Sequence, residues 1–495
     1  MHALDLLGLL ALGGYAVATT FLAGQGLHSL WLLLRFVRAR RPTPPPADSA
    51  AERPAVLVQL PVYDERDVVD RRVEAVGALD WPADRLRIQL LDDGTDDSVA
   101  IGAAAIARLC ARGIDAAQIR RPDRTGFKAG ALAHGLEVDA RRADGPAAFV
   151  AIFDADFVPR PDFLTRAVPP LVADDRLAFV QGRWEHLNAD QSLLTRAQAI
   201  GIDGHFAVEQ AARAWSGLPL NFNGTCGVWR RAAIADAGGW QHDTLTEDLD
   251  LSYRARLRGY RARYDLDLAV PGELPPTLEA WRAQQFRWAK GSLQTARKLL
   301  PAIWRSGLGR VETFAATMHL THYLVHPAMV ASLVLAPIAT LWLRHAPMLA
   351  VALGSVLLAA GLVPPLLLYV VSQLSLGRRP TRLLALPALM SFGTGIALSN
   401  ARAAWQALLG FVSPFVRTPK HGRGRGSYRA PPASGLGELA LGGLGAVGLA
   451  GIWSSRSPWL APIVALYVLG FLLQGAWLLR ARLREALAGA VSDVP

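Results

Sequence analysis

Residues 147–156 read Ala-Ala-Phe-Val-Ala-Ile-Phe-Asp-Ala-Asp, an apolar run that ends at two carboxylates, Asp154 and Asp156. Short apolar runs that stop at polar residues are typical of buried strands in an α/β sheet. In an extended chain, residues two positions apart face the same side, so the two carboxylates should lie together and repel each other. A hard divalent cation would relieve that repulsion. Both residues are therefore candidate metal ligands.

Two earlier segments of the chain follow the same pattern. They are residues 55–60, which lead to Pro61 and Tyr63, and residues 86–91, which lead to Asp92 and Asp93. Helix-like segments separate the three runs, near residues 66–79, 97–112 and 127–142. This alternation predicts a mostly parallel α/β sheet. Ligands of such sheets bind beyond the carboxyl ends of the strands, where these polar residues would gather.

A further acidic cluster, Thr246-Glu247-Asp248, precedes a helix-like stretch. Thr246 suits the N-cap position, and Asp248 would then lie in the first turn, where the helix dipole favours its ionised form. An ionised carboxylate beside an acceptor hydroxyl can act as a general base. An ordinary acidic helix start has the same pattern, so the catalytic interpretation depends on the order of the clusters along the chain.

Three side chains of different chemistry share one predicted helix face, because Gln284, Arg287 and Trp288 have the spacing i, i+3, i+4. A guanidinium can fork onto a phosphate, and an indole offers a flat surface to a sugar ring. Upstream, Lys128 opens a helix-like stretch after Gly126 and offers a compact charge to phosphate. The alternative interpretation of Gln284, Arg287 and Trp288 is an ordinary amphipathic helix. The alternative interpretation of Lys128 is an ordinary helix start.

The composition is that of a membrane protein. Hydrophobic residues make up 52% of the 495 residues, and the mean hydropathy is +0.23. The formal net charge of +11 would suit a nucleic-acid-binding protein. The arginines, however, lie largely beside the apolar segments, as the positive-inside rule requires, so we expect no nucleic-acid partner. Cys110 and Cys226 fall in the predicted cytosolic part and should be reduced.

Several apolar segments are long enough to cross a bilayer. Residues 5–34 contain no Lys or Arg and are followed by four Arg within residues 35–41, which predicts an uncleaved anchor with its N-terminus outside. Further spans are predicted at residues 325–343, 348–374, 436–454 and 458–479. Residues 383–411 should lie at the interface or re-enter, since a crossing would put the basic stretch 417–429 outside. We expect five spans, with six as the alternative.

The predicted domain organisation follows from these boundaries. It comprises an N-terminal membrane anchor at 1–41, a Pro-rich linker at 42–53, an α/β domain at 54–300, and interfacial helices with a C-terminal transmembrane domain at 301–495, including a loop at 411–431. The charge distribution predicts a multi-pass protein of the inner (plasma) membrane, with the α/β domain in the cytosol.

Taken in order and before a membrane region, the clusters resemble a known signature. They are Asp92-Asp93-Gly94, Asp154-Ala155-Asp156, Thr246-Glu247-Asp248 and Gln284-Gln285-Phe286-Arg287-Trp288. They resemble the D, DxD, TED, QxxRW pattern of the family-two glycosyltransferases that make polysaccharides. The runs at 222–225 (Phe-Asn-Gly-Thr) and 417–420 (Arg-Thr-Pro-Lys) are most similar to the cellulose synthase-like branch that includes glucomannan and β-mannan synthases. The resemblance implies a Rossmann-like GT-A domain joined to an α-helical transmembrane domain.

The resemblance also implies roles for individual residues. Asp248 would be the general base, and Asp154 and Asp156 would hold Mg²⁺ or Mn²⁺. The nucleotide sugar would be bound by Tyr63, Glu65, Asp92, Asp93, Lys128, Gln284, Arg287 and Trp288. The acceptor would be bound by Phe222, Asn223, Gly224, Thr225, Glu247 and Trp288. A gating loop over the nucleotide would contain Phe415, Arg417, Thr418, Pro419 and Lys420.

The expected function is an inverting glycosyltransferase that polymerises a β-linked glycan, of cellulose, mannan or glucomannan type, from UDP-glucose or GDP-mannose and passes the growing chain through the lipid bilayer. The alternative is a non-processive transferase that adds one sugar to a membrane lipid. A transporter is disfavoured, because the spans have few ionisable residues besides His319, His322 and His326. The sequence leaves open the donor, the linkage, the acceptor and any periplasmic partner.

Overall fold

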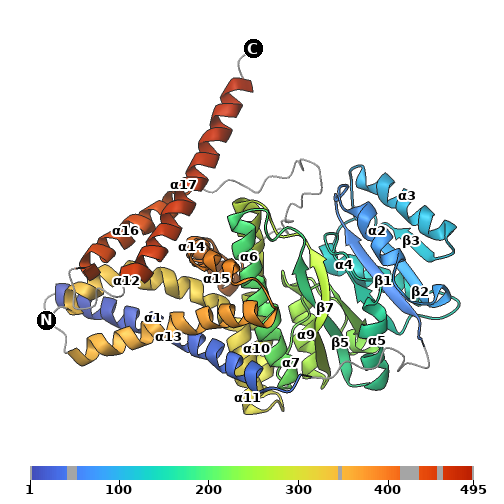
Figure 1. Cartoon of the computed structure of the whole chain (residues 1–495), viewed down its shortest axis with the longest axis horizontal. Helices are drawn as coiled ribbons and strands as arrows, with labels where there is room; N and C mark the ends of the chain where they lie inside the picture. Colours follow the sequence, from blue (N-terminus) through green and yellow to red (C-terminus); the bar gives the residue numbers. More distant parts are fainter. Residues whose placement is uncertain (1–2, 42–52, 344–347, 413–433, 454–460, 493–495) are drawn as a thin grey trace.

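The structure is a computed structural model that describes residues 3–41, 53–343, 348–412, 434–453 and 461–492. An α/β part and a group of long helices lie beside each other, joined by shorter helices (Figure 1). Most of the predicted linker at 42–53, and the whole predicted gating motif at 415–420, lie outside the described residues.

The α/β part is built on one seven-stranded sheet with the order β3-β2-β1-β4-β6-β5-β7. Its strands are β1 (Val56–Val62), β2 (Leu86–Asp92), β3 (Asp115–Ile119), β4 (Phe149–Ile152), β5 (Leu177–His186), β6 (Gly227–Arg230) and β7 (Arg261–Gly272). Neighbouring strands are parallel, except that β6 runs antiparallel to both β4 and β5. The predicted mostly parallel sheet is therefore confirmed.

The register brings the ends of the predicted strands to one edge. Val62 pairs with Asp92, and Gln59 pairs with Ile152, so the residues that follow β1, β2 and β4 meet there. The antiparallel strand β6 begins where β4 ends, and the backbone N–H of Cys226 donates to the carbonyl of Ile152 over 2.9 Å. The loop before β6 is thereby carried to the same edge as the strand ends.

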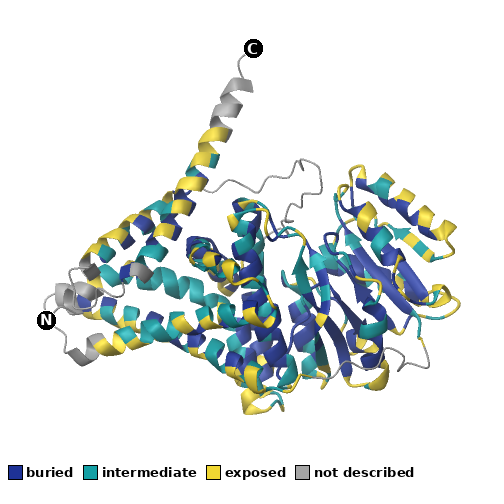
Figure 2. Ribbon diagram, in the orientation of Figure 1, coloured by how far each residue is buried: buried dark blue, intermediate teal, exposed yellow. Residues whose placement is uncertain are grey.

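Both faces of the sheet are covered, which is why the central strands β1 and β4 are almost wholly apolar. On one face α2 (Val69–Gly77), α3 (Ser98–Ala111) and α5 (Phe163–Ala173) pack against one core cluster. The other face is covered by α4 (Phe127–Ala140), α7 (Ala211–Trp215), α8 (Arg231–Asp236) and α9 (Glu247–Leu257). The strands β1, β2, β4 and β6 are buried along most of their length, whereas the edge strand β3 is partly exposed (Figure 2).

The long helices are α1 (Ala3–Arg38), α12 (Val325–Leu343), α13 (Met348–Ser375), α16 (Leu436–Trp453) and α17 (Ala461–Ser492). Within the described residues, four helical stretches are long and apolar enough to cross a membrane, at Gly8–Arg38, Arg310–Ile338, Ala352–Ser375 and Val464–Arg484. The described part of α16 counts as a shorter apolar helix, Leu436–Ala450. These helices indicate a membrane protein, and the expected five or six spans stay a prediction.

The segment 383–411 contains two helices, α14 (Leu386–Gly395) and α15 (Ala397–Leu409), bent by 44° relative to each other. The bend suits a re-entrant or interfacial segment, and equally one broken span, which would be a fifth crossing. α15 packs along α10 (Leu278–Arg305), where Lys290 Nζ donates to Gln406 Oε1 over 3.1 Å. α10 also reaches α16 through an Arg282–Glu438 ion pair of 2.8 Å. The helix with the QxxRW pattern therefore contacts both parts.

Candidate active site

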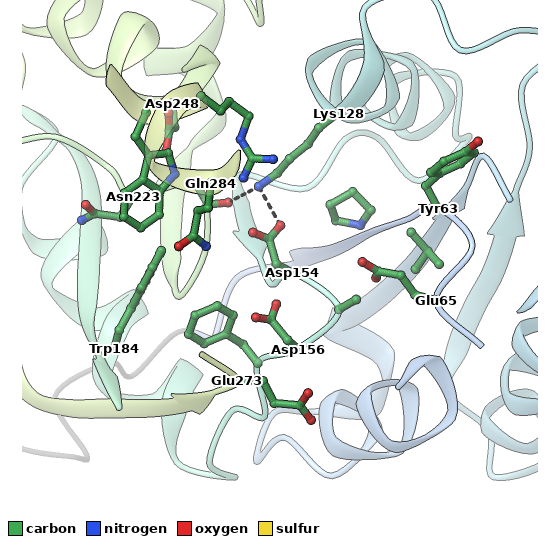
Figure 3. Close-up of a pocket in the computed structure, with 18 of the residues that line it drawn as sticks. Tyr63, Glu65, Lys128, Asp154, Asp156, Trp184, Asn223, Asp248, Glu273 and Gln284 are labelled. Carbon is green, nitrogen blue, oxygen red and sulfur yellow. Dashed lines mark hydrogen bonds and ion pairs between the residues drawn. The ribbon is translucent and has the colours of Figure 1, made fainter. Parts of the chain in front are cut away.

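A cavity opens at the edge of the sheet where the strands end (Figure 3). Its lining includes most of the predicted site residues, namely Tyr63, Glu65, Asp93, Lys128, Asp154, Asp156, Asn223, Gly224, Glu247, Asp248, Gln284, Arg287 and Trp288. These side chains come from segments spread over more than 200 positions, and the sheet register together with α9 and α10 assembles them.

The carboxylates at the end of β4 are accompanied by cations of the protein itself. Lys128 Nζ lies 2.6 Å from Asp154 Oδ1 and 3.9 Å from Glu247 Oε1, and it donates to the carbonyl of Gly224 over 2.8 Å. Burial alone would lower the pKa of Lys128, but the carboxylates around it, Asp154 first, raise the pKa above its ordinary value. Lys128 is therefore a charged ammonium at the centre of the cavity.

A second cation lies behind the same carboxylates. Arg72 of α2 is fully buried and donates to the carbonyl of Phe153 over 3.2 Å, directly before Asp154. Burial lowers the pKa of Arg72, and the nearby charges of Glu65, Asp154 and Asp156 counteract that effect. The sequence argument that the carboxylate pair needs a metal ion for neutralisation is thus too strong, because the protein supplies part of the charge.

The donor set still fits a divalent cation that arrives with phosphate. Among the described residues no group of three or more His, Cys, Asp or Glu side chains could hold a metal ion by itself. Mg²⁺, however, is usually held by one or two carboxylates together with substrate phosphate oxygens. Asp154 and Asp156 both lie at the cavity wall in Figure 3. They could serve a cation that a diphosphate completes.

Asp248 lies in the first turn of α9, as predicted, but its electrostatics differ from the prediction. Burial, and next the charge of Glu247, raise its pKa to about 7, although Lys128 and the Leu249 N–H oppose the shift. The expectation that the helix dipole keeps this carboxylate readily ionised is therefore wrong in direction, because desolvation outweighs the dipole. Such a pKa suits a proton acceptor near neutral pH.

The prediction that Thr246 is the N-cap residue of α9 is confirmed, but its side chain does not make the capping hydrogen bond. The Thr246 hydroxyl lies instead 3.3 Å from the hydroxyl of Thr295 on α10. Gly291 of α10 leaves no room for a side chain against Thr246. The TED segment is thus held by close packing on the helix that carries Arg287.

Tyr63, Asp92 and Asp93 lie where β1 and β2 end, beside one end of the cavity, and they differ in their contacts and burial. The Arg124 guanidinium lies 3.3 Å from the ring centre of Tyr63, which covers one face of the ring. Asp93 lines the cavity and accepts from Arg121 Nε over 3.0 Å. Asp92 is buried, accepts from Gly94 N–H and Gln118 Nε2, and does not line the cavity. Of the two aspartates, only Asp93 is placed to meet a ligand.

The residues of the loop before β6 also fall into two groups, those that line the cavity and those that are buried beneath it. Asn223 and Gly224 line the cavity, whereas Phe222 is buried against Phe179 and Trp229. Thr225 is buried as well, and its hydroxyl accepts from the Asp154 N–H over 2.8 Å. The predicted acceptor role therefore does not fit Phe222 or Thr225, which support the loop from beneath.

Gly224 occupies a position that excludes other residues. Its φ is +77°, and a Cβ atom there would lie 3.0 Å from Asp248 Oδ2 and 3.2 Å from Lys128 Nζ. The missing side chain lets the loop approach both charged groups, so that the Gly224 carbonyl can accept from Lys128.

The helix α10 presents Gln284, Arg287 and Trp288 to the cavity, as the spacing predicted. The Trp288 ring lies 6.3 Å from the ring of Trp184 on β5. Sequence reasoning missed Trp184, Arg124 and Glu273, all of which line the cavity. The run at 177–181 before Trp184 is another apolar strand that ends in polar residues, so the signal used for β1, β2 and β4 could have found it.

The comparisons with known proteins agree with this geometry. Residues 54–291 match the family model described as "Glycosyltransferase like family 2". "Glucomannan 4-beta-mannosyltransferase 2" of Arabidopsis thaliana is 45% identical over 254 residues, covering 51% of this chain and 47% of the relative. "Glucomannan 4-beta-mannosyltransferase 1" of Oryza sativa subsp. japonica is 43% identical over 254 residues, covering 51% and 48%. The match spans about half the length of these curated relatives.

A solved structure shares the fold. It is the "Mannosyltransferase PcManGT from Pyrobaculum calidifontis in complex with GDP-Man and Mn2+", with a TM-score of 0.54 and 20% identity, covering 81% of this chain and 100% of that one. The predicted GT-A fold is confirmed by this likeness together with the family model.

Proposed function

We propose that the chain is an inverting glycosyltransferase of the membrane that polymerises a β-linked mannan or glucomannan from GDP-mannose, on the premise that residues 54–291 match the family-two glycosyltransferase model. The observation that carries the proposal is the meeting of Lys128, Asp154, Asp156 and Asp248 in one cavity. The names of the curated relatives support mannose as the transferred sugar. The GDP-Man bound in the solved neighbour supports GDP-mannose over UDP-glucose.

The donor end of the cavity suits a nucleoside diphosphate. Tyr63, backed by Arg124, offers its ring to the base, and Lys128 and Arg287 face the position of the diphosphate. A divalent ion, Mg²⁺ or Mn²⁺, held by Asp154 and Asp156 would act as a Lewis acid on the leaving group. Lys128 adds a second positive charge next to Asp154. This arrangement stabilises the negative charge that develops on the departing GDP.

Asp248 is the proton acceptor in the part of the cavity that receives the acceptor sugar. Its ionised carboxylate takes the proton of the acceptor hydroxyl while that oxygen attacks the anomeric carbon of the donor sugar. The bond between that carbon and the β-phosphate-bearing oxygen breaks, and the electron pair leaves with GDP. Attack from the opposite face inverts the anomeric configuration, so one base suffices and no covalent intermediate forms. Trp288 offers its ring to the acceptor sugar.

The membrane helices contain a second cavity. It lies between α1, α12, α13, α14, α17 and the end of α11 (Arg310–Thr321), and its lining includes His28, His319, His322, Tyr369 and Tyr467. Histidine and tyrosine side chains can hydrogen-bond the hydroxyls of a neutral sugar chain. We infer that the growing glycan leaves the active site through this cavity, with the catalytic domain on the cytosolic side of a multi-pass protein.

The experiment that tests the proposal uses membrane vesicles with and without the protein. They receive labelled GDP-mannose or UDP-glucose with Mg²⁺ or Mn²⁺, and polymer is separated from lipid extract. Label from GDP-mannose in polymer that a β-mannanase digests is the expected result. Label confined to the lipid phase would favour the single-addition enzyme, and label from UDP-glucose alone would overturn the choice of donor.

A further inference from the structure

A hydrogen-bonded pair stands at the boundary between the two cavities. His205 and Glu209 belong to a π-helical segment, Gly204–Gln210, that interrupts the helix between α6 (Leu193–Asp203) and α7. His205 Nδ1 donates to Glu209 Oε2 over 3.0 Å, and His205 Nε2 lies 3.2 Å from Asn223 Oδ1. π-Helical turns are rare and occur frequently at functional sites. Here the widened turn directs an imidazole at the loop before β6.

The three side chains connect the two cavities. Asn223 lines the cavity that holds Asp248, whereas His205 and Glu209 line the cavity among the membrane helices. A glycan that extends from Asp248 into the membrane passes this boundary. Its sugar units would meet Asn223 and then His205 before the histidines of the membrane helices.

The hydrogen bonds hold the Asn223 amide in one orientation. Its Oδ1 accepts from Asn221 Nδ2 over 2.9 Å as well as from His205. Burial would raise the pKa of Glu209, but the hydrogen bond and charge of His205, with Arg213, hold it at about 2. Glu209 is therefore an acceptor at any pH where the protein works, and it fixes the Nδ1–H side of the ring.

The membrane cavity has further polar atoms that lack hydrogen-bond partners among the described residues. His28 Nε2 and His326 Nδ1 are both buried and make no hydrogen bond there. Buried polar atoms normally have partners, so their presence points to a polar occupant. Apart from Glu209 and Arg213, the side chains in the lining are histidine, tyrosine, other uncharged polar residues and apolar residues, which suits the hydroxyls of a sugar chain better than a diphosphate.

We propose that His205, held by Glu209, is a positioning residue for the acceptor: it orients Asn223 to bind hydroxyls of the terminal units of a β-linked hexosyl chain as that chain crosses between the cavities. The proposal rests on the proposed transferase function. It assigns to His205 and Glu209 a role in binding the acceptor and none in binding the donor. The residues proposed for the donor, Tyr63 and Glu65 among them, lie on the opposite side of the close-up from Asn223 (Figure 3), and the hydrogen bonds of His205 go to Glu209 and Asn223 instead.

The test compares purified full-length wild type with His205→Ala, His205→Gln and, as a matched control, His134→Ala on the outer surface of α4. Initial rates are measured with GDP-mannose and with mannohexaose varied separately. His205→Ala is expected to raise the KM for mannohexaose about tenfold, the value of one hydrogen bond to a charged group. The KM for GDP-mannose and the slow hydrolysis of GDP-mannose without acceptor should stay within about twofold. His205→Gln, which retains a donor toward Asn223, should recover most of the loss.

A binding measurement keeps this inference separate from the proposed function. Mannohexaose and GDP are titrated into each variant, and the quenching of tryptophan fluorescence is followed. Weaker mannohexaose binding by His205→Ala, with GDP binding unchanged, supports the role of His205 even if the wild type transfers no mannose, a result that would sink the proposed function alone. Equal weakening of both ligands with a lower melting temperature, or unchanged binding of mannohexaose, would overturn the inference.

Discussion

The two cavities of this protein differ in how they handle charge. The cavity at the sheet edge holds acidic groups set against cations, with Lys128 2.6 Å from Asp154 and the buried Arg72 behind it. The cavity among the membrane helices is lined mainly by histidine, tyrosine and apolar side chains, and its charged lining residues, Glu209 and Arg213, come from the helical segment that joins α6 to α7 and from α7 itself. Charges inside a bilayer are expensive, whereas neutral polar groups cost less. Under the proposed function, the first cavity suits a charged leaving group and the second suits a neutral chain.

This difference has a consequence for binding strength. A diphosphate among cations forms charge-assisted hydrogen bonds, which are about twice as strong as neutral ones. A neutral sugar chain gains roughly 1 kcal/mol for each hydrogen bond to a neutral partner. Weak, repeated contacts permit a chain to be held and still to advance by one unit. Variants of the first cavity should therefore impair chemistry, and variants of the second should change the length of the product.

The largest effect is expected from Asp248→Asn, which removes the proton acceptor and leaves the shape of the cavity. The rate of transfer should fall about 10²- to 10⁴-fold, the usual contribution of a general base. GDP binding, measured by fluorescence, should change little, because the proposed role of Asp248 concerns the acceptor. A variant that kept a tenth or more of the wild-type rate would show that another group takes the proton.

The next largest effect is expected from Lys128→Ala. It leaves Asp154 without its 2.6 Å ion pair and removes a positive charge from the proposed diphosphate site, so kcat/KM for GDP-mannose should fall roughly 10- to 100-fold. Arg141→Ala, an exposed arginine at the end of the same helix, is the matched control. If both variants behaved alike, the special role of Lys128 would be lost.

A smaller effect follows from pH. Because the pKa of Asp248 is about 7, kcat/KM should drop about tenfold for each pH unit below 7, as the base becomes protonated. The folded state holds this proton more tightly than an unfolded aspartate, so the same group lowers stability as the pH rises from about 4 to 7. Asp248→Asn should abolish both the acid limb and this part of the stability change. A flat rate profile between pH 5 and 8 would contradict the assignment.

The smallest effect is expected in the membrane cavity. His28→Leu removes an imidazole whose Nε2 makes no hydrogen bond among the described residues, so folding should be little affected. The mean polymer length should shorten about two- to fivefold, corresponding to one neutral hydrogen bond, with GDP-mannose hydrolysis unchanged. Leu27→Ala, an exposed neighbour on the same helix, serves as the control. Shortening in both variants alike would refute a glycan path through this cavity.

The sheet and most of the active site were predictable from the sequence because their signals are local. Each of β1, β2 and β4 is an apolar run followed by polar residues, and the rule that parallel strands present ligands at their carboxyl ends brought Tyr63, Asp93 and Asp154 together in advance. The i, i+3, i+4 spacing of Gln284, Arg287 and Trp288 predicts that they share one helix face, and all three line the cavity.

Other properties of the same residues were beyond local reasoning. Asp92 and Asp93 are adjacent and chemically identical, and only packing turns one into a buried loop anchor and the other into a lining residue. The pKa of Asp248 depends on how much protein surrounds it, which the helix start alone does not reveal. Arg72, behind the carboxylate pair, belongs to no motif.

The sequence by itself determined the alternation of strands and helices, the family signature and the apolar segments, because each depends on residues close together in the chain. Only the tertiary structure decided what surrounds each functional group. His205 reaches Asn223 because a π-helical turn meets a loop 18 residues away, and the second cavity is assembled from helices that lie hundreds of residues apart. Burial, charge compensation and cavities arise from contacts between distant segments, and no pattern within a single segment encodes them.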